Sequence, residues 1–472
     1  MSLLSATMLL GSCKDEFLEK EPHSSVPIVT AITTEDELGT AVTGLYASMR
    51  TYETWGRNIP VLGDLLADNT YISADNAGRY LTQNAFRLTP GSAEPTEMWN
   101  NLYETILRAN VIINAELPNA DEATVGQYKG EAYAIRALAF HELVKFFATP
   151  YSVNPSAPGV PVVTEFNAEN LTDYYVSQQP KRNTVAEVYE QIIADYDEAY
   201  RLMGKGAANS SYISKYAAKA LQARAYLFMG EGYYDEARDA ALDVYNNGSY
   251  SLIPATDYVS YWSNPVPVRN RVETIFEISI DAIDNNGSNA LANMYDQGGY
   301  GDIVATPELY NLYAEDDVRK DVIEEGEKAN EDAYFVNKYT NRTNASDKDD
   351  IKVIRYSEVL LTLAEAYART GAGAEALDIL NELTVARNAA EYTSSGDQLI
   401  QDILTERRKE LAFEGDRYWT FMRLNLPVQR TDRHPSDARL IPVGDDRRLQ
   451  PIPQGEIDAN PNILPQNPGY GG

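Results

Sequence analysis

Apolar side chains recur every three or four positions over most of residues 34–425, which is the spacing of a helix that buries one face. Three of these stripes begin at a Ser or Thr followed three positions later by Glu or Gln, the spacing of a helix capping box: Thr34 with Glu37, Thr184 with Glu187, and Ser395 with Gln398. Two more periodic segments run over residues 97–116 and 126–147. The pattern predicts an all-α, α-dominated fold with little β structure.

Strand signals are few. Residues 274–280 alternate in polarity and are rich in β-branched side chains, so they predict a strand. Residues 160–163 form a shorter apolar run bracketed by prolines, and they predict a second strand.

Two helical segments share the pattern Ala-x-Ala-Tyr-x-x-x-Gly, at residues 223–230 and 364–371. The small residues permit close helix packing, and the glycine is placed to end the helix. A second helical stripe follows each segment. The pattern resembles the tetratricopeptide repeat, a stacked pair of helices. We therefore expect tetratricopeptide-like units within residues 126–247 and 352–390, separated by a loop-rich insertion at 248–350.

The N-terminus is a short apolar block that ends at Cys13, the only cysteine among 472 residues. The block is too short to span a membrane but has the length of the hydrophobic region of a secretory signal. Its Leu-Gly-Ser-Cys ending resembles the lipidation site of a bacterial lipoprotein. We predict a signal peptide at residues 1–12, a lipidated Cys13 with an extended tether over 13–33, and one domain over 34–472.

The residues just after Cys13 bear on localisation. Asp15 and Glu16 resemble the acidic tag that directs some Gram-negative lipoproteins to the outer face of the outer membrane. The expected location is therefore the outer membrane, with the protein facing the exterior.

Composition argues against several classes of function. With 40 basic and 70 acidic residues, the formal net charge of -30 argues against nucleic-acid binding. One cysteine excludes a disulfide framework and Cys-ligated metal clusters. His23, His141 and His434 are too few and too scattered for a metal or catalytic site, and no nucleophile elbow or phosphate-binding loop is present. We predict no enzyme activity, no cofactor and no metal site.

A series of short motifs, taken in order, resembles the SusD/RagB family. They lie at residues 99–103 with Ile106 and Asn110, at 136–137, 183–195, 273–276, 317–319, 353–358, 406–417 and 451–470. The resemblance implies surface-exposed outer-membrane lipoproteins that capture nutrients, usually oligosaccharides, as a lid over a SusC-like TonB-dependent transporter. It also implies a helical layer that supports a loop-rich ligand face. The charged residues of 406–417 are interpreted as fold support, because opposite charges at helical spacing pair with each other.

A sugar site needs aromatic faces for pyranose rings and polar side chains for hydroxyls. Two loop-like regions, 55–87 and 281–302, combine these residue types. The predicted ligand contacts are Trp55, Asp68, Asn69, Tyr71, Asn76, Tyr80, Asn293, Tyr295, Asp296 and Tyr300. From sequence, a half-buried packing role explains each tyrosine equally well.

The favoured hypothesis is a lipid-anchored glycan-binding protein that works with a SusC-like transporter and has an oligosaccharide as its ligand. Two alternatives stay open. The same scaffold could capture peptides, or it could be a helical-repeat scaffold that binds a protein partner and no nutrient.

Overall fold

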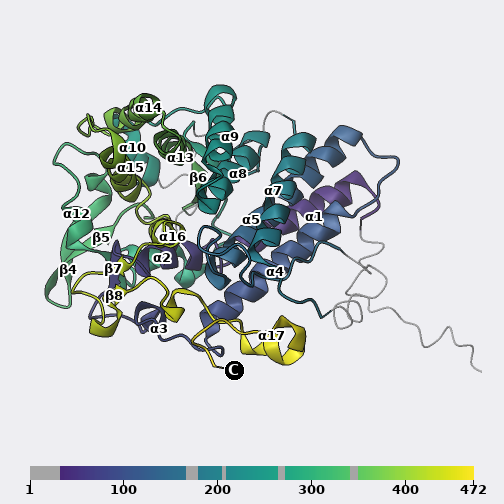
Figure 1. Ribbon diagram of the computed structural model, residues 1–472, viewed down its shortest axis with the longest axis horizontal. Helices are drawn as coiled ribbons and strands as arrows, with labels where there is room; N and C mark the ends of the chain where they lie inside the picture. The colour runs from purple at the N-terminus through teal and green to yellow at the C-terminus, as the bar shows by residue number, and fades with distance from the viewer. Residues whose placement is uncertain (1–31, 166–178, 205–208, 264–271, 341–348, 472) are drawn as a thin grey trace, which may run out of the picture.

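The computed structural model describes residues 32–165, 179–204, 209–263, 272–340 and 349–471 (Figure 1). The predicted signal peptide, Cys13, His23 and nearly all of the predicted tether lie outside these residues. The structure is 51% helical, with 16 helices and only small sheets in its described part. This confirms the α-dominated prediction, whereas the division of the chain into a signal, a tether and one domain stays a prediction.

The helices are α1 (Glu35–Met49), α2 (Asn58–Leu65), α3 (Leu81–Asn84), α4 (Ala93–Ile113), α5 (Glu122–Phe147), α7 (Val185–Leu202), α8 (Lys215–Met229), α9 (Tyr234–Asn247), α10 (Tyr258–Ser263), α11 (Leu291–Tyr295), α12 (Pro307–Tyr310), α13 (Tyr356–Arg369), α14 (Gly373–Ala386), α15 (Gly396–Glu410), α16 (Arg417–Arg423) and α17 (Gln454–Ala459). The strands are β1 (Thr70–Ile72), β2 (Thr274–Ile278), β3 (Ile303–Ala305), β4 (Ile323–Lys328), β5 (Glu331–Val336), β6 (Ile351–Arg355), β7 (Val428–Gln429) and β8 (Leu440–Ile441).

Capping chemistry starts the helices where the sequence predicts. Thr34 and Thr184 each accept from the N–H of the glutamate three positions on, and the glutamate carboxylate accepts from the N–H of that threonine. Helix α15 begins directly after Ser395, but Ser395 makes no side-chain cap, so the helix is confirmed and its capping box is not. The periodic segments 97–116 and 126–147 correspond to α4 and α5.

The two copies of the repeat pattern lie next to each other in space. Helices α4, α5, α7, α8, α9, α13 and α14 pack against one another in that order (Figure 1). The described residues of the segment 248–350 lie outside this array, and the chain rejoins it at α13. Leu227, Ala237 and Ala366 form a small core across the junction of the two copies. Gly230 and Gly371 follow α8 and α13 with φ angles of +82° and +87°, which favour glycine.

One buried arginine joins three helices of the array. Arg136 of α5 donates from Nε and Nη2 to both carboxylate oxygens of Asp195 on α7, at 2.8 and 2.6 Å. Its Nη1 donates to Asn110 Oδ1 on α4 at 2.7 Å. All three residues are buried and belong to the motifs that resemble the SusD/RagB family, so these motif residues hold the helices together.

The insertion carries most of the β structure. Strands β1, β3, β5 and β4 form one sheet in that order, with antiparallel neighbours, and β2 pairs with β6. The strand predicted at 274–280 is confirmed as β2. The prediction of a strand at 160–163 is wrong, because no described strand pairs with these residues. Asn183 N–H donates to Val160 O, and the side chains of Tyr103 and Asn110 on α4 donate to the carbonyl groups of Pro161 and Val163.

The irregular C-terminal segment is held by an arginine that binds carbonyl groups. The buried Arg430 donates to Asn84 O at 2.7 Å, Leu65 O at 3.0 Å and Ala67 O at 3.2 Å. These carbonyls belong to the ends of α2 and α3. The C-terminal segment is thereby fixed beside the loops that the sequence nominated for ligand binding.

The charged segment 406–417 lies in a buried ionic network. Glu410 is fully buried and accepts hydrogen bonds from Arg319, Arg355 and Arg387, at 2.9 to 3.1 Å. Glu273 shares two of these donors, since Arg355 Nη1 and Arg387 Nη2 also donate to Glu273 Oε1, at 2.5 and 2.7 Å. The partners of Glu410 are distant in sequence and do not lie one turn along its own helix. The network therefore ties α15 to the ends of β6 and α14 and to the start of β2.

Candidate functional site

The two loop regions nominated from the sequence meet at one place in the fold. Antiparallel pairing of β1 with β3 sets Tyr71 opposite Val304, so the loop that leaves β1 lies beside the loop that enters β3. Ser73 N–H continues the ladder by donating to Asp302 O at 2.9 Å. Residues 73–80 and 296–302 together are called the two-loop surface below.

Arg79 joins the two loops through a ring and a carboxylate. Its guanidinium carbon lies 3.8 Å from the centre of the Tyr300 ring, a cation–π contact. Its Nη1 lies 3.4 Å from Asp302 Oδ2, and the buried Asp302 also accepts from Ala77 N–H at 3.1 Å. From β4, Lys328 donates to Tyr300 O at 2.6 Å. The loops are therefore cross-linked into a defined surface.

Four predicted ligand residues lie half-buried at or beside this surface: Asn76, Asn293, Asp296 and Tyr300. Asn76 holds its own loop, since its Nδ2 donates to Ser73 O and its Oδ1 accepts from Gly78 N–H. Asn293 accepts from Tyr300 N–H through its carbonyl oxygen. Asp296 Oδ1 accepts from Gly298 N–H at 2.6 Å. Their contact with a ligand stays a prediction.

The other predicted aromatic residues are buried. Tyr295 has no exposed surface and packs against Tyr339 and Phe413, with ring centres about 6 Å apart. Tyr80 is 3% exposed and donates to Asn58 Oδ1. Tyr71 joins a small apolar cluster with Phe335, and Trp55 faces the interior. In this structure the packed protein leaves no ring face of these four residues free for a sugar, so their predicted contacts have no geometric support.

Asp68 and Asn69 are also buried, and their partners are arginines. Asp68 pairs with Arg417 at 2.7 Å and Arg408 at 3.2 Å, and Asn69 Oδ1 accepts from Arg408 Nε at 2.8 Å. Burial by itself would raise the pKa of the Asp68 carboxyl, but the two arginines outweigh it and hold the pKa below its usual value. These two side chains lock the end of α2 to α15 and α16.

Three residues that build the two-loop surface are absent from the contacts predicted from sequence: Arg79 and Asp302, which belong to it, and Lys328, which contacts it from β4. Arg79 and Asp302 lie in or next to the nominated loops, and their charge in an Asn-rich setting was a usable signal. No comparable signal in the sequence points to Lys328. This residue lies in the β4–β5 hairpin, whose sequence shows no clear strand pattern.

A wide groove separate from the two-loop surface lies between α4 and α17. It has a volume of about 460 Å³ and a mostly apolar lining that includes Trp99, Asn100, Tyr103, Leu107, Glu456 and Asn460. It ends at Gln179, next to residues outside the described part of the chain. The groove and the two-loop surface share no residue, so a variant of one can serve as a control for the other.

The described histidines are placed as packing groups. His141 is 1% exposed between the rings of Tyr189 and Phe228, and burial together with nearby Lys145 holds its pKa well below the usual value. Burial and the charge of Arg430 lower the pKa of His434 to about 4.

Among described residues, no three His, Cys, Asp or Glu side chains converge as metal ligands. None of the described helices has the length and apolarity needed to cross a membrane.

Comparisons with known proteins agree with this architecture. A family model described as starch-binding and associating with the outer membrane matches residues 16–227, and the SusD family model matches residues 319–470. The chain belongs to the SusD/RagB family. Proteins of this family are associated with the outer membrane, bind glycans and work with SusC-type transporters, and its members are binding proteins rather than enzymes.

Individual relatives cover nearly the whole SusD-like chain. SusD-like protein P2 of Formosa agariphila is 26% identical over 98% of both chains. A solved protein of Bacteroides vulgatus named for binding sugar is 30% identical, with a TM-score of 0.83 over 94% of this chain and 100% of its own. A SusD superfamily protein of the same organism is 28% identical, with a TM-score of 0.84 over 93% of this chain and 100% of its own.

Proposed function

We propose that this SusD/RagB protein captures an oligosaccharide at the two-loop surface and presents it to a SusC-like TonB-dependent transporter. It leaves the ligand covalently unchanged. Membership of a glycan-binding family supports the class of ligand, and the name of the Bacteroides vulgatus structure agrees with it. The location of the proposed ligand site rests on one observation: residues 73–80 lie against residues 296–302, with Arg79 in contact with the Tyr300 ring.

The chemistry of the surface suits hydroxyl-rich ligands. Arg79 occupies one face of the Tyr300 ring, so a sugar would meet guanidinium N–H groups together with the remaining exposed part of the ring. Asn76, Asn293 and Asp296 add amide and carboxylate groups at the same edge. Opposite charges alternate here, because Asp302 pairs with Arg79 and Asp75 lies 3.9 Å from Lys328. That balance favours a neutral glycan over a highly charged one.

Two substitutions test the location. We expect Tyr300→Ala and Arg79→Ala each to weaken glycan binding about tenfold, the effect of losing roughly 1.4 kcal/mol of contact energy. The measurement is migration in native gels cast with starch and with other soluble polysaccharides. Asn100→Ala, in the separate groove, is the matched control and should migrate like the unaltered protein.

The outcomes separate the alternatives. Unchanged retention of both variants, with loss in Asn100→Ala, would move the site to the groove between α4 and α17. If no polysaccharide is retained but peptides bind, the result favours the alternative that the protein captures peptides. Alanine at Tyr71, Tyr80 or Tyr295 is less informative, because each ring is buried and its loss lowers stability as well as binding.

Anchoring is tested at the predicted lipidation site, which lies outside the described residues. We expect Cys13→Ala to move the protein from the outer-membrane fraction to the soluble fraction, because no second lipid attachment is predicted. The readouts are membrane fractionation and surface labelling of intact cells. Cys13→Ser should behave identically, since it also lacks the thiol that carries the lipid. Unchanged surface labelling of either variant would contradict a lipid anchor at Cys13.

A further inference from the structure

The groove between α4 and α17 has the size and the lining of a site for a small organic molecule. Its volume of about 460 Å³ lies within the range of about 300–1,000 Å³ that is common for such sites. Tyr103, Leu107 and Val163 line it and are half-buried, while Asn100 and Ala459 at its edge are exposed. These side chains reach solvent, so a molecule in the groove can contact them.

One carboxylate lies in this mostly apolar setting. Glu456, on α17, lines the groove and is half-buried. The side chains of Trp99 and Asn460 donate hydrogen bonds to its carboxylate, which hold it in place. Burial raises the pKa of the Glu456 carboxyl, and the two hydrogen bonds offset only part of that effect. The carboxylate is therefore positioned in the groove but only partly compensated for its burial.

Glu456 has no cationic partner within the described part of the chain. No Lys or Arg of these ranges forms an ion pair with it. Residues 166–178, which lie outside the described ranges and connect two parts of the groove wall, contain no Lys or Arg. Glu104 adds a second negative charge at the groove, and it pairs with Arg108 one turn along its own helix at 2.6 Å. The groove thus presents negative charge that the described protein does not balance.

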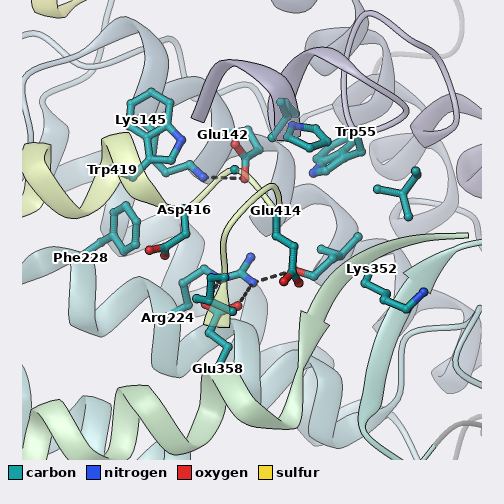
Figure 2. A pocket seen from close by; sticks show the side chains of 16 residues that line it. Trp55, Glu142, Lys145, Arg224, Phe228, Lys352, Glu358, Glu414, Asp416 and Trp419 are labelled. Carbon is teal, nitrogen blue, oxygen red and sulfur yellow. Dashed lines mark hydrogen bonds and ion pairs between the residues drawn. The ribbon is translucent and has the colours of Figure 1, made fainter. Parts of the chain in front are cut away.

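A second pocket, lined by residues of α5, α8 and β6, differs in this respect (Figure 2). There Lys145 lies 2.8 Å from the Glu142 carboxylate, and Arg224 lies 2.6 Å from that of Glu358. These carboxylates already have cations supplied by the protein. Glu456 has none among described residues, so its groove is the better candidate for a cation that comes from outside.

We propose that the groove between α4 and α17 binds a small organic molecule with an apolar body and one ammonium group. The ammonium group lies against the Glu456 carboxylate, and the apolar body lies along Tyr103, Leu107 and Val163. The cation supplies the partner that a partly buried carboxylate needs, and the apolar lining strengthens their attraction. An anionic molecule is disfavoured, because Glu104 and Glu456 repel it. This inference does not depend on the proposed glycan function.

The surroundings of the groove favour a small molecule over a protein partner. Interfaces with proteins are marked by contiguous patches of exposed apolar side chains. Among described residues, none of the large hydrophobic side chains that are widely exposed lines the groove. Its apolar surface is confined to the concave wall, which suits one small ligand.

The test compares two probes that share an apolar body, phenylbutylammonium and phenylbutanol. Their affinities for the protein are measured at neutral pH by ligand-observed NMR titration. We expect the ammonium compound to bind about tenfold more tightly than the alcohol. Glu456→Gln keeps an acceptor for the Trp99 indole and removes the charge. It should lower the affinity for the ammonium compound about tenfold and leave the affinity for the alcohol unchanged.

Two further variants separate the groove from the general charge of the protein. Asp458→Asn is the matched control: it removes the same charge from the same helix, but Asp458 is exposed and does not line the groove. Its affinity for both probes should equal that of the unaltered protein. Ala459→Phe places a bulky ring at the exposed edge of the groove, where it should weaken both probes without disturbing the core.

Three outcomes would overturn the proposal. One is equal affinity for the ammonium compound and the alcohol. Another is an equal loss of ammonium binding in Glu456→Gln and Asp458→Asn, which would show a long-range effect of net charge. The third is tighter binding of the peptide acetyl-Leu-Lys-Leu-amide than of phenylbutylammonium, which would assign the groove to a segment of a partner protein.

Discussion

Glu410→Ala is expected to lower the free energy of unfolding by about 3–5 kcal/mol, the cost of breaking a buried ion pair from one side. Glu410 is fully buried and accepts hydrogen bonds from three guanidinium groups, those of Arg319, Arg355 and Arg387. Removing its carboxylate takes one partner from each buried guanidinium group and leaves Arg355 and Arg387 to share Glu273. Urea unfolding followed by circular dichroism measures the change.

The charge of Glu410 carries this effect more than its shape. Burial would raise the pKa of Glu410, but the arginines, Arg387 first, outweigh it and hold the pKa well below its usual value. Glu410→Gln, which keeps the shape and removes the charge, should therefore lose most of the same stability. Asp437→Ala is the control, because its ion pair with Arg87 is exposed on both sides and solvent screens it, so its loss should change stability little. A loss below 1 kcal/mol for Glu410→Ala would contradict the structural role assigned to the network.

The helical part of the fold could be predicted because its signals are local. In α7, a capping box at Thr184 precedes buried residues at 185, 188, 189, 192 and 196, one face of a single helix. Each of these features lies within a few turns of the next. The stacking of α13 on α9 could not be predicted this way, since residues 248–350 separate the two copies and no local pattern specifies where the chain returns.

The hairpin of β4 and β5 shows what the sequence left unspecified. Its strands pair from Ile323 with Val336 to Lys328 with Glu331, but the run of glutamates in β4 hides the alternation of a half-buried strand. Its turn uses Ala329 and Asn330 at positive φ, a weaker signal than Asn-Gly. Because the hairpin was not predicted, the contact of Lys328 with Tyr300 could not be predicted either.

The candidate site was predictable as two regions but not residue by residue. Residues 74–79 of the first region and 296–300 of the second do reach solvent at one surface, but residues 55–73 are buried, because they form α2, β1 and the turns beside them. The exposure of a given aromatic ring could not be predicted, because the residues that cover it in the fold are remote from it in sequence. Tyr295 packs on Tyr339 and Phe413, while Tyr300, five positions later, stays half-exposed against Arg79.

The motifs that resembled the SusD/RagB family turn out to be buried cross-links. Asn110, Arg136 and Asp195 meet in one hydrogen-bonded group, and Glu273, Arg319, Arg355 and Glu410 meet in another. A fold is recognisable from such residues because each needs its partners from other segments. The residues of the two-loop surface belong to none of these motifs, so the motifs specify the fold rather than the proposed ligand surface.

Gly63→Ala should destabilise the protein by about 3 kcal/mol or more, through overlap of backbone atoms. A Cβ at Gly63, on the buried face of α2, would lie 2.0 Å from Gly415 O and 2.3 Å from its carbonyl carbon. Gly415 itself has a φ of +84°, and a Cβ there would lie 2.8 Å from the Cα of Pro60, one turn before Gly63 in α2. Two facing glycines thus allow α2 to touch the turn that leads from α15 to α16.

Because the clash involves backbone on both sides, no side-chain rotation relieves it, and the loss should persist in every solution condition. Gly373→Ala is the matched control: it lies at the start of α14 with no atom within 4 Å of the added methyl group. There, alanine should leave stability unchanged or raise it by up to about 1 kcal/mol, because it favours the helix. Thermal unfolding of the two variants side by side separates close contact from helix propensity. Equal melting temperatures would show that α2 yields to the added methyl group, and that the contact between Gly63 and Gly415 is not essential for the fold.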